Sequence, residues 1–176
     1  MAAITLHGKV IHTSGMLPAV GSKAPHFVLT RADLTDVSLK DFLGKKIVLN
    51  IFPSLDTGVC AVSVRRFNKE AVQLRDTVVL CISADLPFAH KRFCETEGIA
   101  NVVNLSDMRN KDFGKLYGVA IIDGPLAGLL SRAVAVLDEQ GIVKYTEQVP
   151  KIEQEPDYET ALSVIDRFAF GGKAVQ

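Results

Sequence analysis

The sequence has few of the residues that mark disulfide-rich, fibrous or disordered proteins. Its 176 residues contain 3 cysteines and no tryptophan, and no two cysteines form a Cys-x-x-Cys pair. Its 13 glycines and 7 prolines fall far short of the roughly 25–30% that is typical of low-complexity chains. Hydrophobic residues make up 48%, which is enough for a packed core. These proportions exclude disorder and argue against a disulfide framework.

The sequence also lacks an excess of charge and an export signal. Twenty Lys and Arg residues balance 20 Asp and Glu residues, so nothing attracts a polyanion. The first nine residues show no basic segment followed by an apolar run and a small-residue cleavage site. We therefore expect a cytoplasmic protein that binds neither nucleic acid nor a membrane.

One stretch, Val119–Leu137, is apolar enough to suggest a membrane span. It contains Asp123 and Arg132, each of which costs about 2.5–3.5 kcal/mol near a bilayer centre, and a Gly124-Pro125 break lies between them. A loop that leads into a buried strand fits this pattern better.

The length and the apolar pattern predict one domain, residues 1–176, of the α/β class. Residues 1–13 read as a hairpin with a turn at His7-Gly8, and residues 169–176 read as a flexible tail. Further strands are predicted at 27–29, 47–52, 78–83, 102–105, 133–137 and 142–148, and helical segments at 39–42, 60–74, 88–97, 111–117 and 158–168. This order predicts a mixed central sheet flanked by helices.

Cys60 lies where a buried strand passes into a helix. The segment Pro53–Cys60 leaves the carboxyl end of the predicted strand 47–52, where open α/β sheets place their ligand sites. The free N–H groups of a helix N-terminus stabilise a thiolate. A free cysteine is also often a small buried hydrophobe, so position alone leaves both interpretations open.

A reactive thiolate needs more than ionisation. For a thiol in general, the gain in thiolate fraction from a lower pKa is largely offset by weaker nucleophilicity, which leaves a net gain of only about two- to three-fold. Donors that stabilise the transition state are therefore needed, and Thr57 and Arg132 are suitable. Arg132 precedes the apolar strand 133–137, so it is either paired or functional, or its side chain extends to solvent.

The other cysteines and the histidines carry weaker signals. Cys81 lies mid-strand among apolar residues and is expected to be structural, and for Cys94 the residues alone favour packing beside Phe93. The histidines have no zinc-ligand spacing, so no metal site is expected. They are His7, His12, His26 and His90. A Cys-His hydrolase stays open as an alternative if the fold brings an imidazole to Cys60.

Several segments together resemble the bacterial thiol peroxidases, the atypical two-cysteine branch of the peroxiredoxins. Residues Asn50–Cys60 carry a Pro-x-x-x-Thr-x-x-Cys signature, and Val79–Ala89 leads to Arg92-Phe93-Cys94. The likeness continues through 118–120, 124–126, 132–134 and 155–158, so it covers nearly the whole chain. The sequence departs from the family chiefly in its tail, residues 168–176.

This resemblance implies a thioredoxin-like fold with an added N-terminal hairpin. It also implies an antioxidant enzyme that reduces hydrogen peroxide and alkyl hydroperoxides to water and alcohols, with thioredoxin as reductant. Cys60 would be the peroxidatic cysteine, and Cys94 the resolving cysteine that pairs with it in an intramolecular disulfide. Thr57 and Arg132 would hold the thiolate and the peroxide oxygens, and Pro53 would shield the pocket. Neither a cofactor nor a metal is implied, and the family forms homodimers.

One expectation about the disulfide depends on this assignment. Cys60 is placed in the first turn of one helix and Cys94 near the end of another, whereas a disulfide needs Cα atoms about 4.4–6.8 Å apart. We therefore expect local unwinding on oxidation. A redox sensor of the same fold, oxidised at Cys60 and signalling through a partner, is the non-catalytic alternative.

Overall fold

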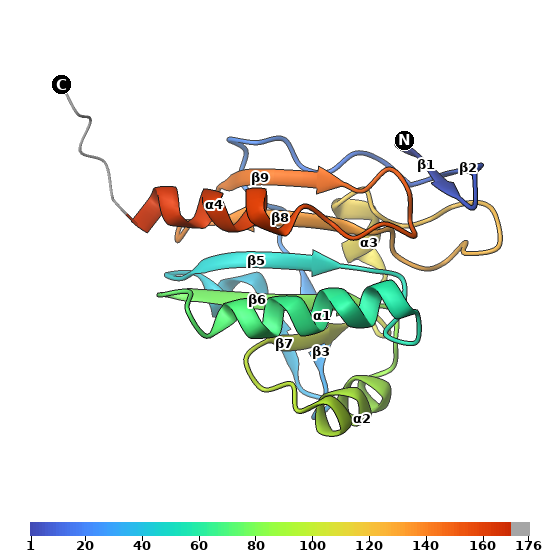
Figure 1. The fold of residues 1–176 in the computed structure, drawn as a ribbon. Helices are drawn as coiled ribbons and strands as arrows, with labels where there is room; N and C mark the ends of the chain where they lie inside the picture. The colour runs from blue at the N-terminus through green and yellow to red at the C-terminus, as the bar shows by residue number, and fades with distance from the viewer. Residues whose placement is uncertain (170–176) are drawn as a thin grey trace.

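A seven-stranded mixed sheet forms the centre of the computed structural model, which describes residues 1–169. Its strands are β3 (Val28–Arg31), β4 (Asp36–Ser38), β5 (Lys46–Ile51), β6 (Thr77–Ser83), β7 (Val103–Ser106), β8 (Ala133–Leu137) and β9 (Val143–Gln148). They lie in the order β4-β3-β7-β6-β5-β8-β9 (Figure 1). Only β5, β6 and β7 pair in parallel, and the other pairs are antiparallel. The predicted α/β class with a mixed sheet is confirmed.

Helices cover both faces of the sheet because its central strands are apolar on both sides. Successive residues of β5 alternate between two cores, with Leu49 in one and Val48 in the other. The Val48 face is covered by α1 (Gly58–Ala71), α2 (Pro87–Glu97) and α4 (Tyr158–Ala169). The opposite face is covered by α3 (Asp112–Leu116) and the 3₁₀ helix η1 (Leu39–Phe42). Figure 1 shows α1 and α4 in front of the sheet and α3 behind it.

The predicted N-terminal hairpin is present as β1 (Ala3–Leu6) and β2 (Lys9–His12). Both turn residues have positive φ, +48° at His7 and +79° at Gly8, as a tight two-residue hairpin turn requires. The Thr5 N–H donates to the Pro150 carbonyl at 2.8 Å, and the Ile152 N–H donates to the Thr5 carbonyl at 3.0 Å. The hairpin is therefore fixed to the loop between β9 and α4.

Two elements differ from the sequence prediction. Strand β4 was not predicted, because its three residues are too few for an alternating pattern to stand out. Helix α1 ends at Ala71 rather than at residue 74. Beyond it the chain tightens, with the Leu74 N–H donating to the Ala71 carbonyl at 3.2 Å, and Leu74 still packs on the helix-covered core. The apolar spacing thus predicted burial correctly but extended the helix too far.

At the C-terminus, helix α4 runs to Ala169. The rest of the predicted tail, 170–176, lies outside the described residues.

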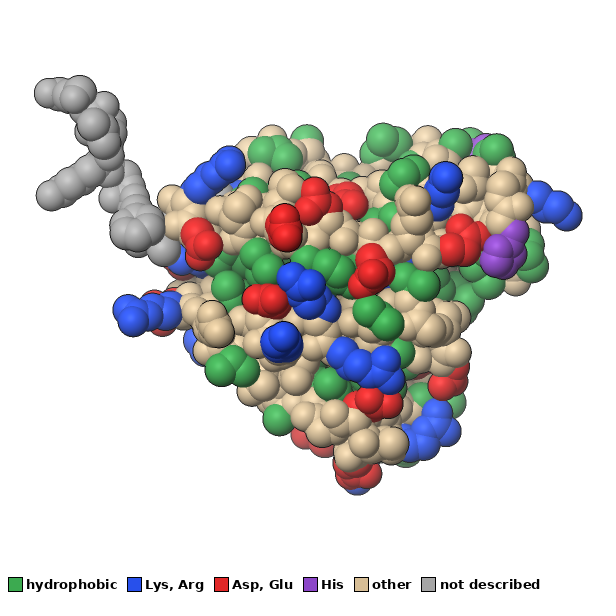
Figure 2. All heavy atoms as spheres, in the orientation of Figure 1, with side chains coloured by type: hydrophobic (Ala, Val, Ile, Leu, Met, Phe, Trp, Pro, Cys, Tyr) green, Lys and Arg blue, Asp and Glu red, His purple; other side chains and the backbone are tan. Residues whose placement is uncertain are grey.

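The apolar stretch 119–137 forms a loop followed by β8, as the sequence predicted. Among residues 1–169, no helix combines the length and the apolar character that crossing a membrane requires. Figure 2 shows acidic and basic side chains interspersed on the face that carries α1 and α4, with no patch of a single sign.

Two glycines with nearly the same φ allow a test of close packing at the end of α3. Gly118 has φ +68°, and a Cβ there would lie 2.2 Å from the Met16 carbonyl oxygen, whereas Gly98 has φ +66° and open space around it. We predict that Gly98→Ala lowers the free energy of unfolding by roughly 1 kcal/mol and Gly118→Ala by roughly 3 kcal/mol or more. Urea denaturation measures both, and equal losses would contradict the predicted clash.

Candidate active site

Cys60 lies in the first turn of α1, which begins at Gly58 after Thr57 as N-cap. The strand β5 ends just before this segment, so Cys60 sits at the carboxyl end of the central parallel strands. Its side chain is fully buried. The Ser63 hydroxyl donates to the Cys60 carbonyl at 2.8 Å within the helix. Burial alone is equally typical of a cysteine with a structural role.

Arg132 is the neighbour that sets Cys60 apart. Although arginine is rarely buried, Arg132 is only 3% exposed, which rules out the extended, solvated interpretation. Its Nη2 donates to Cys60 Sγ at 3.3 Å, and its Nε donates to the Ile152 carbonyl at 2.9 Å. No carboxylate within residues 1–169 forms an ion pair with this guanidinium. Its Nη1 is buried without a partner in the same part of the chain.

Arg132 also lines a cavity of about 300 Å³ at the start of α1. The lining residues are Leu6, His7, Pro53, Thr57, Gly58, Val59, Leu126, Leu129, Arg132, Ile152 and Glu153. Pro53, Thr57 and Arg132, all singled out from the sequence, thus meet around one space. The Thr57 hydroxyl donates to the Ser54 carbonyl at 3.1 Å and does not hydrogen-bond to Cys60. The walls are mainly apolar, which suits a ligand with a hydrocarbon part.

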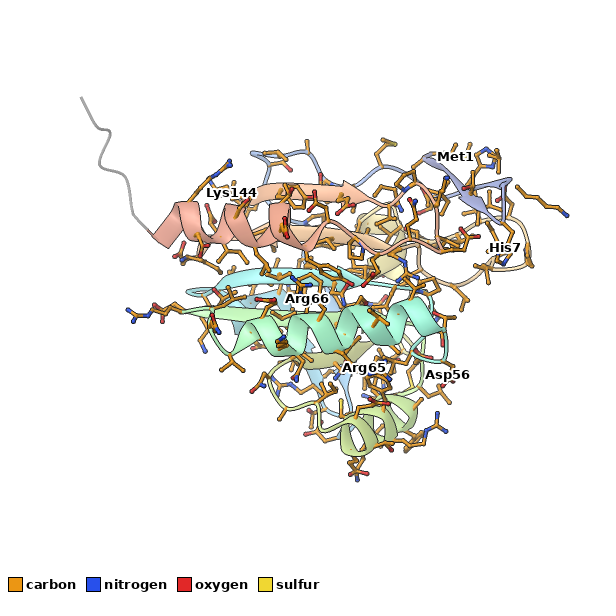
Figure 3. All side chains as sticks on the ribbon, viewed as in Figure 1. Met1, His7, Asp56, Arg65, Arg66 and Lys144 are labelled. Carbon is orange, nitrogen blue, oxygen red and sulfur yellow. The ribbon has the colours of Figure 1, made fainter. Side chains whose placement is uncertain are left out.

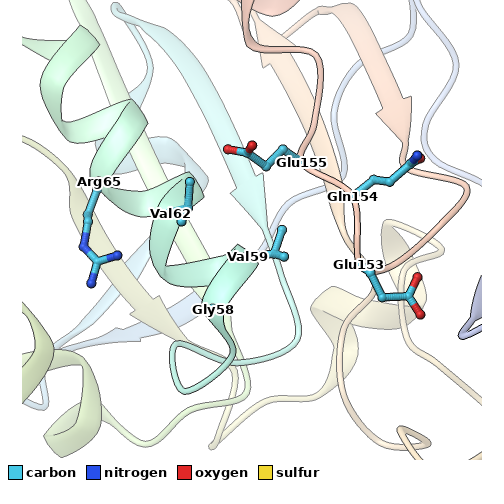
Figure 4. Close-up of a pocket in the computed structure, with 7 residues that line it drawn as sticks. All are labelled: Gly58, Val59, Val62, Arg65, Glu153, Gln154 and Glu155. Carbon is cyan, nitrogen blue, oxygen red and sulfur yellow. The ribbon is translucent and has the colours of Figure 1, made fainter.

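A larger and shallower hollow of about 910 Å³ lies next to this cavity. Figure 4 shows Val59, Val62 and Arg65 on α1, across from Glu153, Gln154 and Glu155 on the loop before α4, with the Val59 and Glu155 side chains directed into the space between. The Arg65 guanidinium is already paired with Glu97, with Nε 2.8 Å from the carboxylate. In Figure 3, Arg65 and Arg66 project outward along α1. Arg132, which donates to Cys60, lines the smaller cavity and not this hollow, so the smaller cavity is the candidate active site.

Cys94 lies in α2, away from this cavity, and is partly buried. The Asn104 amide, on β7, donates to Cys94 Sγ at 2.8 Å. Burial raises the pKa of the Cys94 thiol, and the amide donor opposes that effect. All three cysteines are free thiols in this structure, so Cys60 and Cys94 are not joined. Their pairing stays a prediction.

The third thiol, Cys81, is fully buried in β6, as the sequence predicted from its mid-strand position. Burial raises its pKa to about 12, so the thiol stays protonated at neutral pH.

No imidazole of the described chain hydrogen-bonds to Cys60. His7 lines the cavity, but its Nδ1 lies 3.1 Å from a Glu153 carboxylate oxygen. Figure 3 places it on the hairpin turn, at the same end of the molecule as Asp56. His90 is buried elsewhere and contacts Ser83. A hydrolase with a Cys-His pair is therefore not supported. Within residues 1–169 no three His, Cys, Asp or Glu side chains form a group that could hold a metal ion.

A partly buried chain of polar side chains, which the sequence did not indicate, supports the loop ahead of Cys60. The Asp85 carboxylate accepts from Ser54 Oγ at 2.7 Å, from the Leu55 N–H at 2.8 Å and from Ser83 Oγ at 2.6 Å. His90 Nε2 lies 3.1 Å from Ser83 Oγ. The available signal was that Ser54 and Asp85 each follow a parallel strand, and the carboxyl ends of such strands lie side by side.

Residues 19–162 match the family model described as Redoxin, which is most of the chain. The chain belongs to the redoxin family. Within it, thiol peroxidases of Mycobacterium tuberculosis and Mycobacterium bovis are each 56% identical over 165 residues, which cover 94% of this chain and 99% of the relative. The recognition of a thiol peroxidase is therefore confirmed, as is the enzyme class, an oxidoreductase of the peroxidase type.

A solved structure supports the same conclusion for the fold. The chain superposes on a peroxiredoxin-like protein from Aquifex aeolicus with a TM-score of 0.90 and 36% identity. The match covers 95% of this chain and 97% of that one. The predicted thioredoxin-like fold with an added hairpin is confirmed.

The forked guanidinium of Arg132 generates a prediction about catalysis. Lysine keeps the charge but carries all its N–H donors on one nitrogen, so it loses the fork by which Arg132 reaches Ile152 and Cys60 from separate nitrogens. We predict that Arg132→Lys lowers kcat/KM for peroxide roughly 10²–10³-fold, with an unchanged far-UV circular dichroism spectrum. The control is Arg109→Lys, an exposed arginine paired with Asp36. A variant with the kinetics of the parent would show that the fork is not needed.

His90 generates a prediction about stability and pH. Burial lowers the pKa of His90 from 6.5 to about 4. The unfolded chain therefore binds more protons than the folded one in this range, so the free energy of unfolding falls as the pH drops from 6.5 towards 4, by roughly 3 kcal/mol. His90→Gln should remove this contribution, whereas replacing the exposed His26 should not. Urea unfolding at several pH values measures it, and parallel curves for His90→Gln and the parent would contradict it.

Proposed function

We propose that this enzyme reduces hydrogen peroxide and alkyl hydroperoxides through Cys60, forms a Cys60–Cys94 disulfide and is recycled by thioredoxin. Cys60 is the peroxidatic nucleophile in this proposal, and Cys94 is the resolving cysteine. Thr57 and Arg132 orient the sulfur and the peroxide, and Pro53 closes the cavity against water. Family membership supports the peroxidase chemistry, and the role of Arg132 rests on its contact with Cys60. The roles of Cys94, Thr57 and Pro53 rest on the resemblance to the family.

The contact between Arg132 and Cys60 is the observation that carries the proposal. A buried positive charge without a counter-charge costs several kcal/mol. The only polar side-chain partner of the Arg132 guanidinium in the described chain is Cys60 Sγ, at 3.3 Å. Cys60 as a thiolate completes the ion pair. Arg132 thereby links the buried sulfur to the cavity, because Arg132 lines that cavity whereas Cys60 itself is not among its lining residues.

The cavity offers the groups that peroxide reduction needs. Arg132 Nη1 has no protein partner among the described residues, so it is free to donate to a peroxide oxygen. The thiolate attacks one oxygen, an S–O bond forms as the O–O bond breaks, and Cys60 becomes a sulfenic acid. The leaving hydroxide or alkoxide takes up a proton and departs as water or alcohol. Leu126, Leu129 and Ile152 provide an apolar wall for an alkyl group.

Resolution joins two thiols that the reduced structure holds apart. The Cys94 sulfur attacks the sulfenic sulfur, the S–S bond forms, and the displaced hydroxide leaves with the Cys94 proton as water. Because Cys94 is held by Asn104 in this state, α2 has to loosen before the bond forms. A dithiol then donates two electrons and two protons to restore both thiols. Thioredoxin is the reductant in this proposal.

The assembly and the compartment complete the proposal. Three free thiols, two of them with a raised pKa and one buried against a guanidinium, suit a reducing compartment such as the cytoplasm. We place the enzyme there as a homodimer, the assembly that the family implies.

The test is steady-state peroxide turnover with thioredoxin, its reductase and NADPH. We predict that Cys60→Ser abolishes turnover. Cys94→Ser should support a single turnover that leaves a sulfenic acid, detected with a dimedone-type reagent. Cys81→Ser is the matched control and should keep activity within about two-fold, because this thiol is protonated and remote from the cavity. Stoichiometric oxidation without many cycles would favour a redox sensor instead.

A further inference from the structure

Helix α2 is tied to the sheet by two polar contacts on its buried side. His90 and Cys94 are four residues apart, so they lie on the same face of the helix. His90 is fully buried and contacts Ser83 of β6, while Cys94 contacts Asn104 of β7. Among the residues of α2 only Pro87 and His90 are buried, and Phe93 is partly buried against the core. The two polar contacts therefore add to the packing of Phe93 in holding the helix in place.

The hydrogen-bond partners define the direction of the His90 contact. The Ser83 hydroxyl has one proton, which it donates to a carboxylate oxygen of Asp85, with 2.6 Å between the two oxygens. Ser83 Oγ therefore accepts from His90, which places the proton of the neutral imidazole on Nε2. The Asp85 carboxylate also accepts hydrogen bonds from the Ser54 hydroxyl and the Leu55 N–H. The loop ahead of Cys60 and helix α2 are thus connected through one partly buried carboxylate.

We propose that Asn104 and His90 are positioning residues that hold α2 against the sheet and thereby set the rate at which Cys94 reaches oxidised Cys60. This inference rests on the proposed function, because it assumes that Cys94 resolves the Cys60 sulfenic acid. Neither residue contacts the peroxide or the reacting oxygen. Both contacts have to break before α2 opens, so each slows the step that forms the disulfide and leaves the first oxidation of Cys60 unchanged.

The consequence is a balance between two fates of the sulfenic acid. While α2 stays closed, a second peroxide can oxidise Cys60 to the sulfinic acid. When α2 opens, Cys94 forms the disulfide and prevents that reaction. Asn104 and His90 therefore determine the peroxide concentration at which the enzyme is inactivated, even though they lie outside the cavity.

The first experiment removes the amide donor. Reduced protein is mixed with one equivalent of hydrogen peroxide, quenched at intervals with N-ethylmaleimide and analysed by mass spectrometry, which separates sulfenic acid from disulfide. We expect Asn104→Leu to form the disulfide about five-fold faster, the factor that corresponds to one ordinary hydrogen bond, with sulfenic acid formed at the parental rate. Thr30→Val is the control, because it removes a buried hydroxyl from the neighbouring strand β3 without touching α2.

The second experiment tests the other contact and does not depend on the first variant folding. Glutamine places its amide nitrogen near the position of His90 Nε2, whereas asparagine is too short to reach Ser83. We expect His90→Gln to keep the parental rate of disulfide formation and His90→Asn to raise it several-fold. Lys91→Asn and Lys91→Gln, at the adjacent exposed position, correct for the difference in helix propensity.

The outcomes separate this inference from the proposed function. If the parent protein forms no Cys60–Cys94 disulfide, the proposed resolving role of Cys94 is wrong. If the disulfide forms and its rate is the same in Asn104→Leu and His90→Asn as in their controls, the positioning role is wrong. Slower disulfide formation in Asn104→Leu would also overturn it, because the amide would then act by ionising Cys94. A variant in which sulfenic acid formation and disulfide formation slow by the same factor has only a structural defect.

Discussion

The contact between a buried guanidinium and a buried thiol organises this molecule. Arg132 lies at the start of β8, and Cys60 lies one strand away at the start of α1, so the antiparallel pairing of β5 with β8 brings them together. The other end of the guanidinium is fixed by the Ile152 carbonyl. That carbonyl belongs to the loop held by the N-terminal hairpin through Thr5. The hairpin therefore supports the site as well as lining its cavity.

The two thiols assigned to one reaction have opposite surroundings. Cys60 is fully enclosed and faces a cation, whereas Cys94 is partly exposed and accepts a single amide hydrogen bond. Helix α2 ends at Glu97, with Gly98 as its C-cap, and only Pro87 and His90 among its residues are buried. In the proposed reaction, the movement that brings Cys94 to Cys60 would then be concentrated in this one short helix.

Most of the fold was predictable because its central strands are long and continuously apolar. Strands β5 and β6, the order of helices and strands after them, and the N-terminal hairpin were all predicted close to their observed bounds. The short strand β4 was missed, and α1 was extended by three residues, because local apolar spacing records burial and not backbone hydrogen bonding. Of the site, the positions of Cys60, Thr57, Pro53 and Arg132 around one end of the sheet followed from the strand-to-helix junction and the family signature.

By itself, the sequence determined the strand-loop-helix segment that places Cys60 at a helix N-terminus, because local patterning and one short signature specify it. It also singled out Arg132 but left open whether that side chain was buried or solvated. Only the tertiary structure decided that question, since the answer depends on β5 pairing with β8 and on a carbonyl twenty residues further along. The chain from Asp85 through Ser83 to His90, and the amide of Asn104 on Cys94, likewise arise from contacts between separate strands and helices. Hydrogen bonds between such distant residues leave no periodic trace in a single sequence.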